Sequence, residues 1–341
     1  MRRSSAFLAL LLLAGCNAPA TPRLIANPGG PATLPLNPPP RQSCGLPDRF
    51  DVLPVEMVGR QPVVKITMDA ATASMVLDTG ASGTVVTSAF AARFNARAAQ
   101  PAQQVVTQGV DGRTAVRRGY VETLGMGTAT LRGVNVNITP ATLGPPTQPR
   151  DGLLGLDLLG LYDADIDLAG GRVKLYRGKL CPEAESPWKS QAFELKARRA
   201  AGDGLLGTVE LAADRADQRP AKLEVPVVLN GKIVWALIDT GATNTIVRED
   251  IAASVGVTPE MLAADPVGRT FGSGGGTAVI HLHRFDTIRI AGETEPDPRL
   301  LIGPLPAGTA MLLGADYLTK HRVWLSYATA RVFVAKGTVV D

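Results

Sequence analysis

The stretch "VLDTGASGTVV", residues 76–86, ends a strongly β-prone run at an aspartate and continues through a turn of small residues into another β-prone run. Taken alone, Asp-Thr-Gly is an ordinary turn, because loops favour these residue types. The chain repeats the pattern as "LIDTGATNTIV" at residues 237–247, with Asp239 standing 161 positions after Asp78. Two copies of this turn in one chain indicate an internal repeat.

Three further features recur around these turns. Residues 60–94 and 220–255 both read as strand, turn, strand, Asp-Thr-Gly, strand and a short helical segment. Each is followed by a hairpin pattern with a Gly-rich tip, at residues 109–127 and 272–292. Last come "GLLGLDLLG" at 152–160 and "MLLGADYLT" at 311–319. The common order predicts an all-β fold of two similar lobes, each with a short helix.

The ends of the chain predict a secreted, anchored protein. Residues 1–15 have the basic start and short apolar run of a signal peptide, and "LAGC" before Cys16 is similar to a bacterial lipobox. We expect lipidation of Cys16, the alternative being an ordinary signal peptide with a chance cysteine. The Pro-rich residues 16–43 predict an extended tether, followed by an N-terminal lobe at 44–185 and a C-terminal lobe at 186–341.

Charge and cysteines limit the partners and the compartment. The formal charge of +4 falls to +2 without Arg2 and Arg3, and no basic cluster is present, so we expect no nucleic-acid partner. In an oxidising periplasm Cys44 and Cys181 are expected to form a disulfide, the alternative being two unrelated thiols. Asn17 stands where aspartate usually marks inner-membrane retention, which favours the outer membrane as the location of the lipid anchor.

With both Asp-Thr-Gly-Ala turns, both hairpins and both Leu-Leu-Gly segments in view, the chain resembles the retropepsin-like aspartic proteases, duplicated in one chain as in the two-lobed pepsin-like enzymes. The resemblance covers most of residues 48–338 and implies a two-lobed acid-protease fold with a peptide cleft between the lobes. It implies an aspartic endopeptidase that acts on protein or peptide substrates, with no cofactor. Because one chain carries two lobes that differ in sequence, joined by a long segment around residues 182–221, we expect a monomer.

The resemblance also implies a site. Asp78 and Asp239 would be the catalytic pair, because two close carboxylates cannot both ionise cheaply and so supply an acid and a base together. The supporting residues would be Thr79, Gly80, Ala81, Thr240, Gly241 and Ala242. The threonines would reach across to the backbone of the other lobe, and the glycines would allow a tight turn. The substrate-binding flap residues would be Gly109, Val110, Asp111 and Gly112 in the first lobe, and Gly272, Ser273 and Gly274 in the second.

Departures from the family pattern refine these expectations. Ala81 and Ala242 offer no side-chain hydroxyl to an ionised carboxylate, which predicts a mildly acidic pH optimum. The flap ranges Gly109–Arg118 and Gly272–His281 contain no aromatic residue. We therefore expect the flap backbone to hold an extended peptide as an added strand.

Other functions are less favoured by the residues. His281 and His283 form a His-x-His pair without further ligands nearby, so we interpret them as strand-surface histidines and expect no metal. For Asp157 and Asp316 we expect hydrogen bonds within their own lobes. The alternative function is a non-catalytic, peptide-binding envelope lipoprotein on a protease fold. Both Asp-Thr-Gly turns are intact, which favours catalysis.

Overall fold

The computed structural model describes residues 49–94, 97–98, 104–144, 147–176, 186, 188, 192–200, 221–272 and 275–337. The chain divides into two units, Met1–Ser43 and Cys44–Asp341. The first unit lies outside the described residues, and everything below concerns the second. In the described part of the chain, no helix combines the length and the apolar character needed to cross a bilayer.

The first lobe is built on a sheet that has nine strands among the described residues, ordered β2-β3-β4-β10-β5-β9-β8-β6, with β7 paired to β8. Its strands are β2 (Glu56–Val58), β3 (Gln61–Met68), β4 (Ala71–Leu77), β5 (Val85–Thr87), β6 (Arg97–Ala98), β7 (Gln104–Gly109), β8 (Gly112–Met126), β9 (Ala129–Thr139) and β10 (Gly152–Leu154). Its short helices are α1 (Ser88–Ala91), the 3-10 turn η1 (Ala92–Phe94) and α2 (Leu156–Leu159).

The second lobe repeats this plan in a sheet with ten described strands, ordered β18-β19-β22-β17-β23-β16-β15-β20-β21, with β14 paired to β15. Its strands are β14 (Arg198–Arg199), β15 (Leu223–Leu229), β16 (Lys232–Ile238), β17 (Ile246–Arg248), β18 (Val267–Phe271), β19 (Thr277–Arg284), β20 (Thr287–Ile290), β21 (Glu293–Pro296), β22 (Arg299–Gly303) and β23 (Met311–Leu313). Its helices are α3 (Glu249–Ser254), α4 (Pro259–Ala264) and α5 (Ala315–Leu318).

The two lobes share an uncommon strand arrangement at their centres. In the first lobe β10 lies between β4 and β5, parallel to β4 and antiparallel to β5. In the second lobe β23 lies between β16 and β17 with the same two orientations. The expectation of an all-β fold of two similar lobes, each with short helices, is therefore confirmed.

A third, six-stranded sheet takes strands from both halves of the chain, in the order β1-β12-β11-β24-β25-β13. Its members are β1 (Arg49–Pro54), β11 (Asp163–Asp167), β12 (Arg172–Tyr176), β13 (Phe193–Leu195), β24 (His321–Ser326) and β25 (Arg331–Lys336). Strands β11 and β24 pair across the junction, where buried Arg322 donates two hydrogen bonds to the carboxylate of buried Asp165, at 2.8 and 2.6 Å. This sheet holds the two lobes together.

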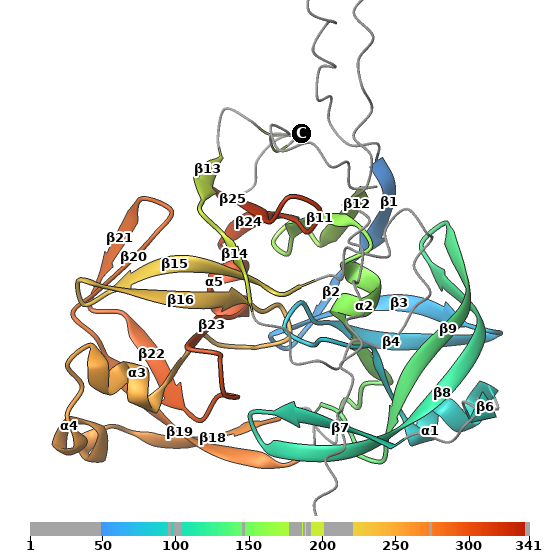
Figure 1. The fold of residues 1–341 in the computed structure, drawn as a ribbon, viewed down its shortest axis with the longest axis horizontal. Coiled ribbons are helices and arrows are strands. Elements are labelled where there is room, and N and C mark those ends of the chain that lie inside the picture. The colour runs from blue at the N-terminus through green and yellow to red at the C-terminus, as the bar shows by residue number, and fades with distance from the viewer. Residues whose placement is uncertain are drawn as a thin grey trace, which may run out of the picture. The chain divides into compact units, whose positions relative to one another are not determined.

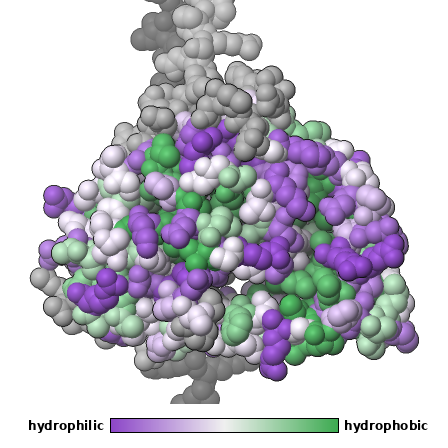
Figure 2. Space-filling view, turned by 180° about the vertical axis from the view of Figure 1, so that it is seen from behind, coloured by the Kyte–Doolittle hydropathy of each residue, from purple (hydrophilic) through white to green (hydrophobic). Residues whose placement is uncertain are grey.

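Figure 1 shows the lobes on either side of this third sheet, with the hairpins β7–β8 and β18–β19 along the lower edge. The view from behind in Figure 2 shows mostly hydrophilic surface, with an apolar area low on the second lobe. Exposed Val267, Phe271 and Val279 lie on that lobe's hairpin. Most of the remaining large apolar side chains are buried in one core that extends through both lobes.

Candidate active site

Asp78 and Asp239 each follow directly on a buried central strand. The N–H of Asp78 donates to the carbonyl of Leu154 in β10, and the N–H of Asp239 donates to the carbonyl of Leu313 in β23, both at 3.0 Å. Strand pairing thus continues up to the aspartate on each lobe. The small residues that follow turn the chain back, which leaves the carboxylate at the end of the sheet.

The structure brings the two carboxylates together across the lobe boundary. A Cβ atom added to Gly80 would lie 2.4 Å from the carboxylate of Asp239, and one added to Gly241 would lie 2.4 Å from that of Asp78. Each glycine is therefore packed against the aspartate of the opposite lobe. Any side chain at either position would push the pair apart.

The two threonines connect the turns to each other. Thr79 Oγ1 donates to the carbonyl of Ile238, and Thr240 Oγ1 donates to the carbonyl of Leu77, both at 2.7 Å. Each hydroxyl also accepts the backbone N–H of the other threonine, at 3.0 and 3.1 Å. Both threonine side chains are buried, so these four bonds are shielded from water and fix the relative position of the aspartates.

Backbone amides bind one oxygen of each carboxylate. Asp78 Oδ1 accepts from the N–H groups of Gly80 and Ala81, at 3.0 and 2.8 Å. In the second lobe Asp239 Oδ1 accepts in the same way from the N–H groups of Gly241 and Ala242, at 2.9 and 3.1 Å. These bonds hold the two planar carboxylates in place and leave the Oδ2 atoms for chemistry.

The environment raises the pKa of both carboxyl groups. Burial raises the pKa of Asp78 to about 8, and the charge of Asp239 adds to this rise. The N–H of Ala81 and the charge of Lys222 act in the opposite direction. Burial also raises the pKa of Asp239, against the opposing effects of its backbone bonds, Lys222 and a hydrogen bond with Asp78. The pair therefore keeps a shared proton at a pH where ordinary carboxyl groups are ionised.

The pair lies in a cavity of about 570 Å³ between the two lobes. Equivalent apolar clusters line this cavity on either side of the pair. Val76, Val85, Leu143 and Leu153 line it in the first lobe, and Leu237, Ile246 and Leu312 line it in the second, where Leu305 packs with them. Such matched pockets suit the two side chains that flank one peptide bond.

The predicted flaps meet over this cavity. Gly109 and Val110 of the first flap and Gly272 of the second line it. Asp111 points to the second flap instead, where its Oδ2 accepts the N–H of Gly276 at 2.8 Å. Gly112 closes the first turn with a positive φ of 109°. Ser273 and Gly274 lie outside the described residues, as do Cys16, Cys44 and Cys181.

Some supporting residues differ from the sequence-based interpretation. The side chain of His283 is buried and lies 2.6 Å from Asp265, so its interpretation as a surface histidine was wrong. Asp157 and Asp316 do bond within their own lobes, to Thr84 and Thr245, which confirms that expectation. Within the described ranges no group of three or more metal-ligating side chains is found.

The cavity lining includes residues that the sequence did not predict, among them Arg150, Lys222 and Phe271. Phe271 stands one residue outside the flap range searched for aromatics, and it is 70% exposed. Lys222 precedes β15, and its place near the aspartates depends on a sheet edge that no local pattern marks. Gln61, at the equivalent position of the first repeat, is uncharged, so the repeat did not predict a charged cavity residue at Lys222 either.

A pair of buried carboxylates, one from each of two similar lobes, locked by cross-lobe threonines and covered by two hairpins, defines a site of the aspartic protease class. The family described as "Aspartyl protease" matches residues 64–158 and 225–317, which together are more than half of the chain. The chain therefore belongs to the aspartyl protease family.

Comparison with solved structures matches the crystal structure of an aspartic proteinase from Irpex lacteus. The two are 13% identical with a TM-score of 0.49, and the match covers 84% of this chain and 97% of the other. Among curated proteins no match is found.

Proposed function

We propose that this protein is an aspartic endopeptidase that hydrolyses peptide bonds with one water molecule activated between Asp78 and Asp239. The observation that carries the proposal is the packing of each carboxylate against the glycine of the opposite turn, 2.4 Å from where a Cβ would stand. A chain that only held peptides would not need this close approach, which costs the burial of two ionisable groups.

The proposed reaction uses the shared proton. The ionised carboxylate takes a proton from water while the water oxygen attacks the peptide carbonyl carbon, and the protonated carboxyl gives its proton to the carbonyl oxygen. The tetrahedral diol then collapses, one carboxyl protonates the leaving nitrogen, and the C–N bond breaks. The other carboxylate receives the proton of the diol hydroxyl, so the pair ends with one proton, as it began.

Substrate binding follows from the surroundings of the pair. The apolar clusters of the two lobes would take the side chains on either side of the cut. The flap backbone around Gly109 and Gly272 would add to an extended peptide as a further strand. Peptide substrates fit this proposal, because successive side chains of an extended strand point in opposite directions, here toward the pockets of the two lobes.

We further propose that the protein is a monomer, lipid-anchored through Cys16 and facing the periplasm, with the outer membrane favoured. The support is the signal-like start, the lipobox-like "LAGC", Asn17 and the Pro-rich residues that follow. Cys16→Ser should release the protein into the soluble periplasmic fraction or block its processing. Unchanged membrane fractionation would count against the anchor.

Cleavage of a diverse peptide library in ¹⁸O-labelled water tests the proposed chemistry. One label should enter each new C-terminal carboxylate, a statine-type transition-state analogue should inhibit cleavage, and Asp78→Asn should abolish it. Peptide binding without cleavage by the wild-type protein would instead favour the non-catalytic envelope lipoprotein.

A further inference from the structure

The two pockets that flank the aspartate pair are equivalent in their apolar walls and differ at one charged position. Arg150 lines the cavity beside the first-lobe pocket formed by Val76, Val85, Leu143 and Leu153. The backbone N–H of Arg150 donates to the carbonyl of Leu143 at 2.8 Å, which fixes the arginine against this pocket. In the second lobe the equivalent position is Thr309, which is uncharged.

Arg150 is 94% buried and keeps unused hydrogen-bonding capacity. Its Nη1 donates to the carbonyl of Gln148 at 2.5 Å and its Nη2 to that of Val58 at 3.3 Å, while its Nε has no partner. Among the described residues no carboxylate forms an ion pair with it, and only the charge of exposed Glu56 supports its protonated form, against the effect of burial. A buried guanidinium with neutral partners favours an incoming anion.

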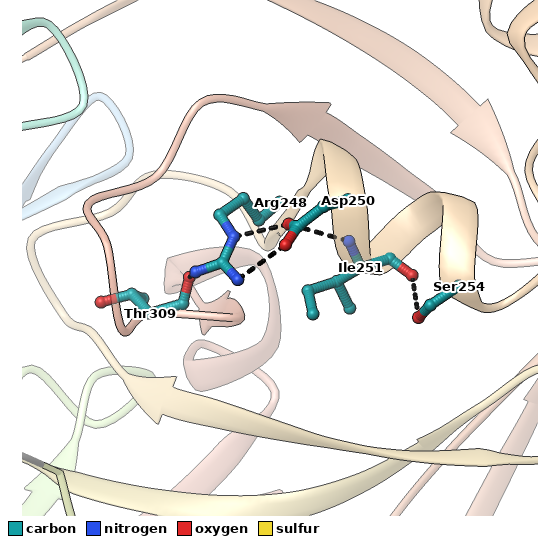
Figure 3. A network of polar contacts seen from close by, with 5 residues as sticks. All are labelled: Arg248, Asp250, Ile251, Ser254 and Thr309. Carbon is teal, nitrogen blue, oxygen red and sulfur yellow. Dashed lines mark hydrogen bonds and ion pairs between the residues drawn. The ribbon is translucent and has the colours of Figure 1, made fainter.

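In the second lobe, the arginine near the equivalent position is paired with a carboxylate. There Arg248 donates to the carbonyl of Thr309 at 2.7 Å and pairs through Nε and Nη2 with both carboxylate oxygens of Asp250, at 2.6 and 2.9 Å (Figure 3). This arginine is neutralised within the protein. At the positions of Arg248 and Asp250 the first lobe has Thr87 and Ala89, so it contains no equivalent of this ion pair.

The rest of the cavity wall carries the same sign of charge. Arg60 and Arg269 also line the cavity, and its acidic lining residues are Asp78 and Asp239, which share a proton. The wall as a whole therefore attracts negative charge.

We propose that the first-lobe pocket selects a glutamate or aspartate side chain of the substrate, with its methylene groups against the apolar walls and its carboxylate on Arg150. This inference rests on the proposed peptidase function and makes Arg150 its specificity-determining residue. Because the second lobe has Thr309 at the position of Arg150, the acidic side chain is selected on one side of the scissile bond and an apolar one on the other.

The test compares peptides that differ only in Glu, Gln or Leu at each of the two positions flanking the cut. All are acetylated and amidated, so that a terminal carboxylate cannot substitute for the side chain, and all are assayed near pH 6. At one position kcat/KM should be roughly tenfold or more higher for Glu than for Gln. Arg150→Met should reduce this ratio to about one, and Arg150→Lys should retain part of it.

Arg93→Met is the matched control. Arg93 is an exposed arginine beside Asp151, outside the cavity, and its removal should leave the Glu-to-Gln ratio unchanged. Equal or better cleavage of Gln at both positions by the wild-type protein would overturn the inference, whether or not the Arg150 variants fold. So would an unchanged ratio in folded Arg150→Met.

A binding measurement separates this inference from the proposed function. Reduced-amide versions of the same peptides cannot be cleaved, and their Kd values should show the same preference for Glu at one position. Tighter binding of the Glu peptide without any cleavage of the parent peptides would support the acidic specificity of the first-lobe pocket and refute the proposed peptidase activity. Cleavage with no preference for Glu in Kd or kcat/KM would support the peptidase activity and refute the acidic specificity.

Discussion

Asp78 and Asp239 owe their raised pKa to burial more than to any single neighbour. Burial is the largest cause of the raised pKa of each carboxyl, and the backbone amides that bind them offset only part of it. Ala81 and Ala242 contribute their N–H groups and no hydroxyl. The pair is thus set to exchange its proton well above the range of exposed carboxyl groups.

These pKa directions predict a bell-shaped dependence of kcat/KM on pH. Activity should fall in acid, as the second carboxyl takes a proton, and fall again as the pH approaches 8 and the shared proton is lost. The maximum then lies in mildly acidic conditions. An optimum at strongly acidic pH would contradict this origin of the profile.

Lys222 provides a check on the same profile. Its positive charge lowers the pKa of both aspartates, so Lys222→Met should raise both and move both limbs of the bell to higher pH. A loss of activity without movement of the limbs would mean that Lys222 acts only on structure or binding.

Asp157 is a buried carboxyl outside the aspartate pair, and we expect it to affect stability rather than catalysis. Thr84 donates to its Oδ1 through both N–H and Oγ1, and burial raises its pKa from 3.8 to about 6. The folded state therefore holds this proton more tightly than the unfolded state does. The resulting stability is fully present below pH 3.8 and is lost as the pH rises through 6, a difference of ~3 kcal/mol.

Asp157→Asn should accordingly remove this part of the pH dependence. Denaturant unfolding at pH 4 and pH 7 should show a smaller loss of unfolding free energy in the variant than in the wild type, because the aspartate pair contributes equally to both. Asp316→Asn, the same change at the less buried equivalent position, is the control. An equal loss of unfolding free energy between pH 4 and pH 7 in the wild type and in Asp157→Asn would show that Asp157 does not cause this pH dependence.

The individual strands and hairpins could be predicted from the sequence, whereas the pairing between distant strands could not. Repeated β-prone runs and Gly-rich tips were enough to predict β4, β16 and both flaps, because strand period and turn chemistry are local. Arg150 and Lys222 reach the cavity only through the insertion of β10 beside β4 and the pairing of β14 with β15. His283 lies on an alternating strand, yet Asp265 from a neighbouring loop covers it.

The two flap hairpins are joined by a contact that the sequence analysis did not foresee. Asp111 accepts the N–H of Gly276, and a Cβ on Gly272 would lie 1.9 Å from its Oδ1. The glycines of the second tip thus make room for the carboxylate of the first. This contact favours the closed arrangement over the cavity.

Asp111→Ala should therefore loosen the flaps. We expect KM for peptides to rise by roughly a few-fold to tenfold with a smaller change in kcat, because the lost hydrogen bond acts on closure and not on the aspartate pair. The exchange of the Gly276 amide hydrogen should also become faster. Arg113→Ala, exposed on β8 beside the same tip, is the control, and equal effects of the two changes would refute the role of the contact.

In the molecule as a whole, the third sheet joins the two lobes into one unit. Pairing of β11 with β24, together with the buried Arg322–Asp165 ion pair, fixes the lobes so that each supplies one aspartate. The sequence showed the repeat, and the family resemblance implied that the two lobes face each other. The third sheet was not predicted, because its strands lie far apart in the chain and no local pattern indicates their pairing. The lipid anchor and the Cys44–Cys181 disulfide concern residues outside those described and stay predictions.

The central claim is that one chain forms one site from Asp78 and Asp239. The measurement that tests it is peptide cleavage by Asp78→Asn, Asp239→Asn and an equimolar mixture of the two, each purified as a folded protein. If the site lies within one chain, each variant is inactive, because a single carboxyl cannot supply both acid and base, and the mixture is inactive as well. Substantial activity in either variant alone, or recovery of activity on mixing, would show that the site forms between chains.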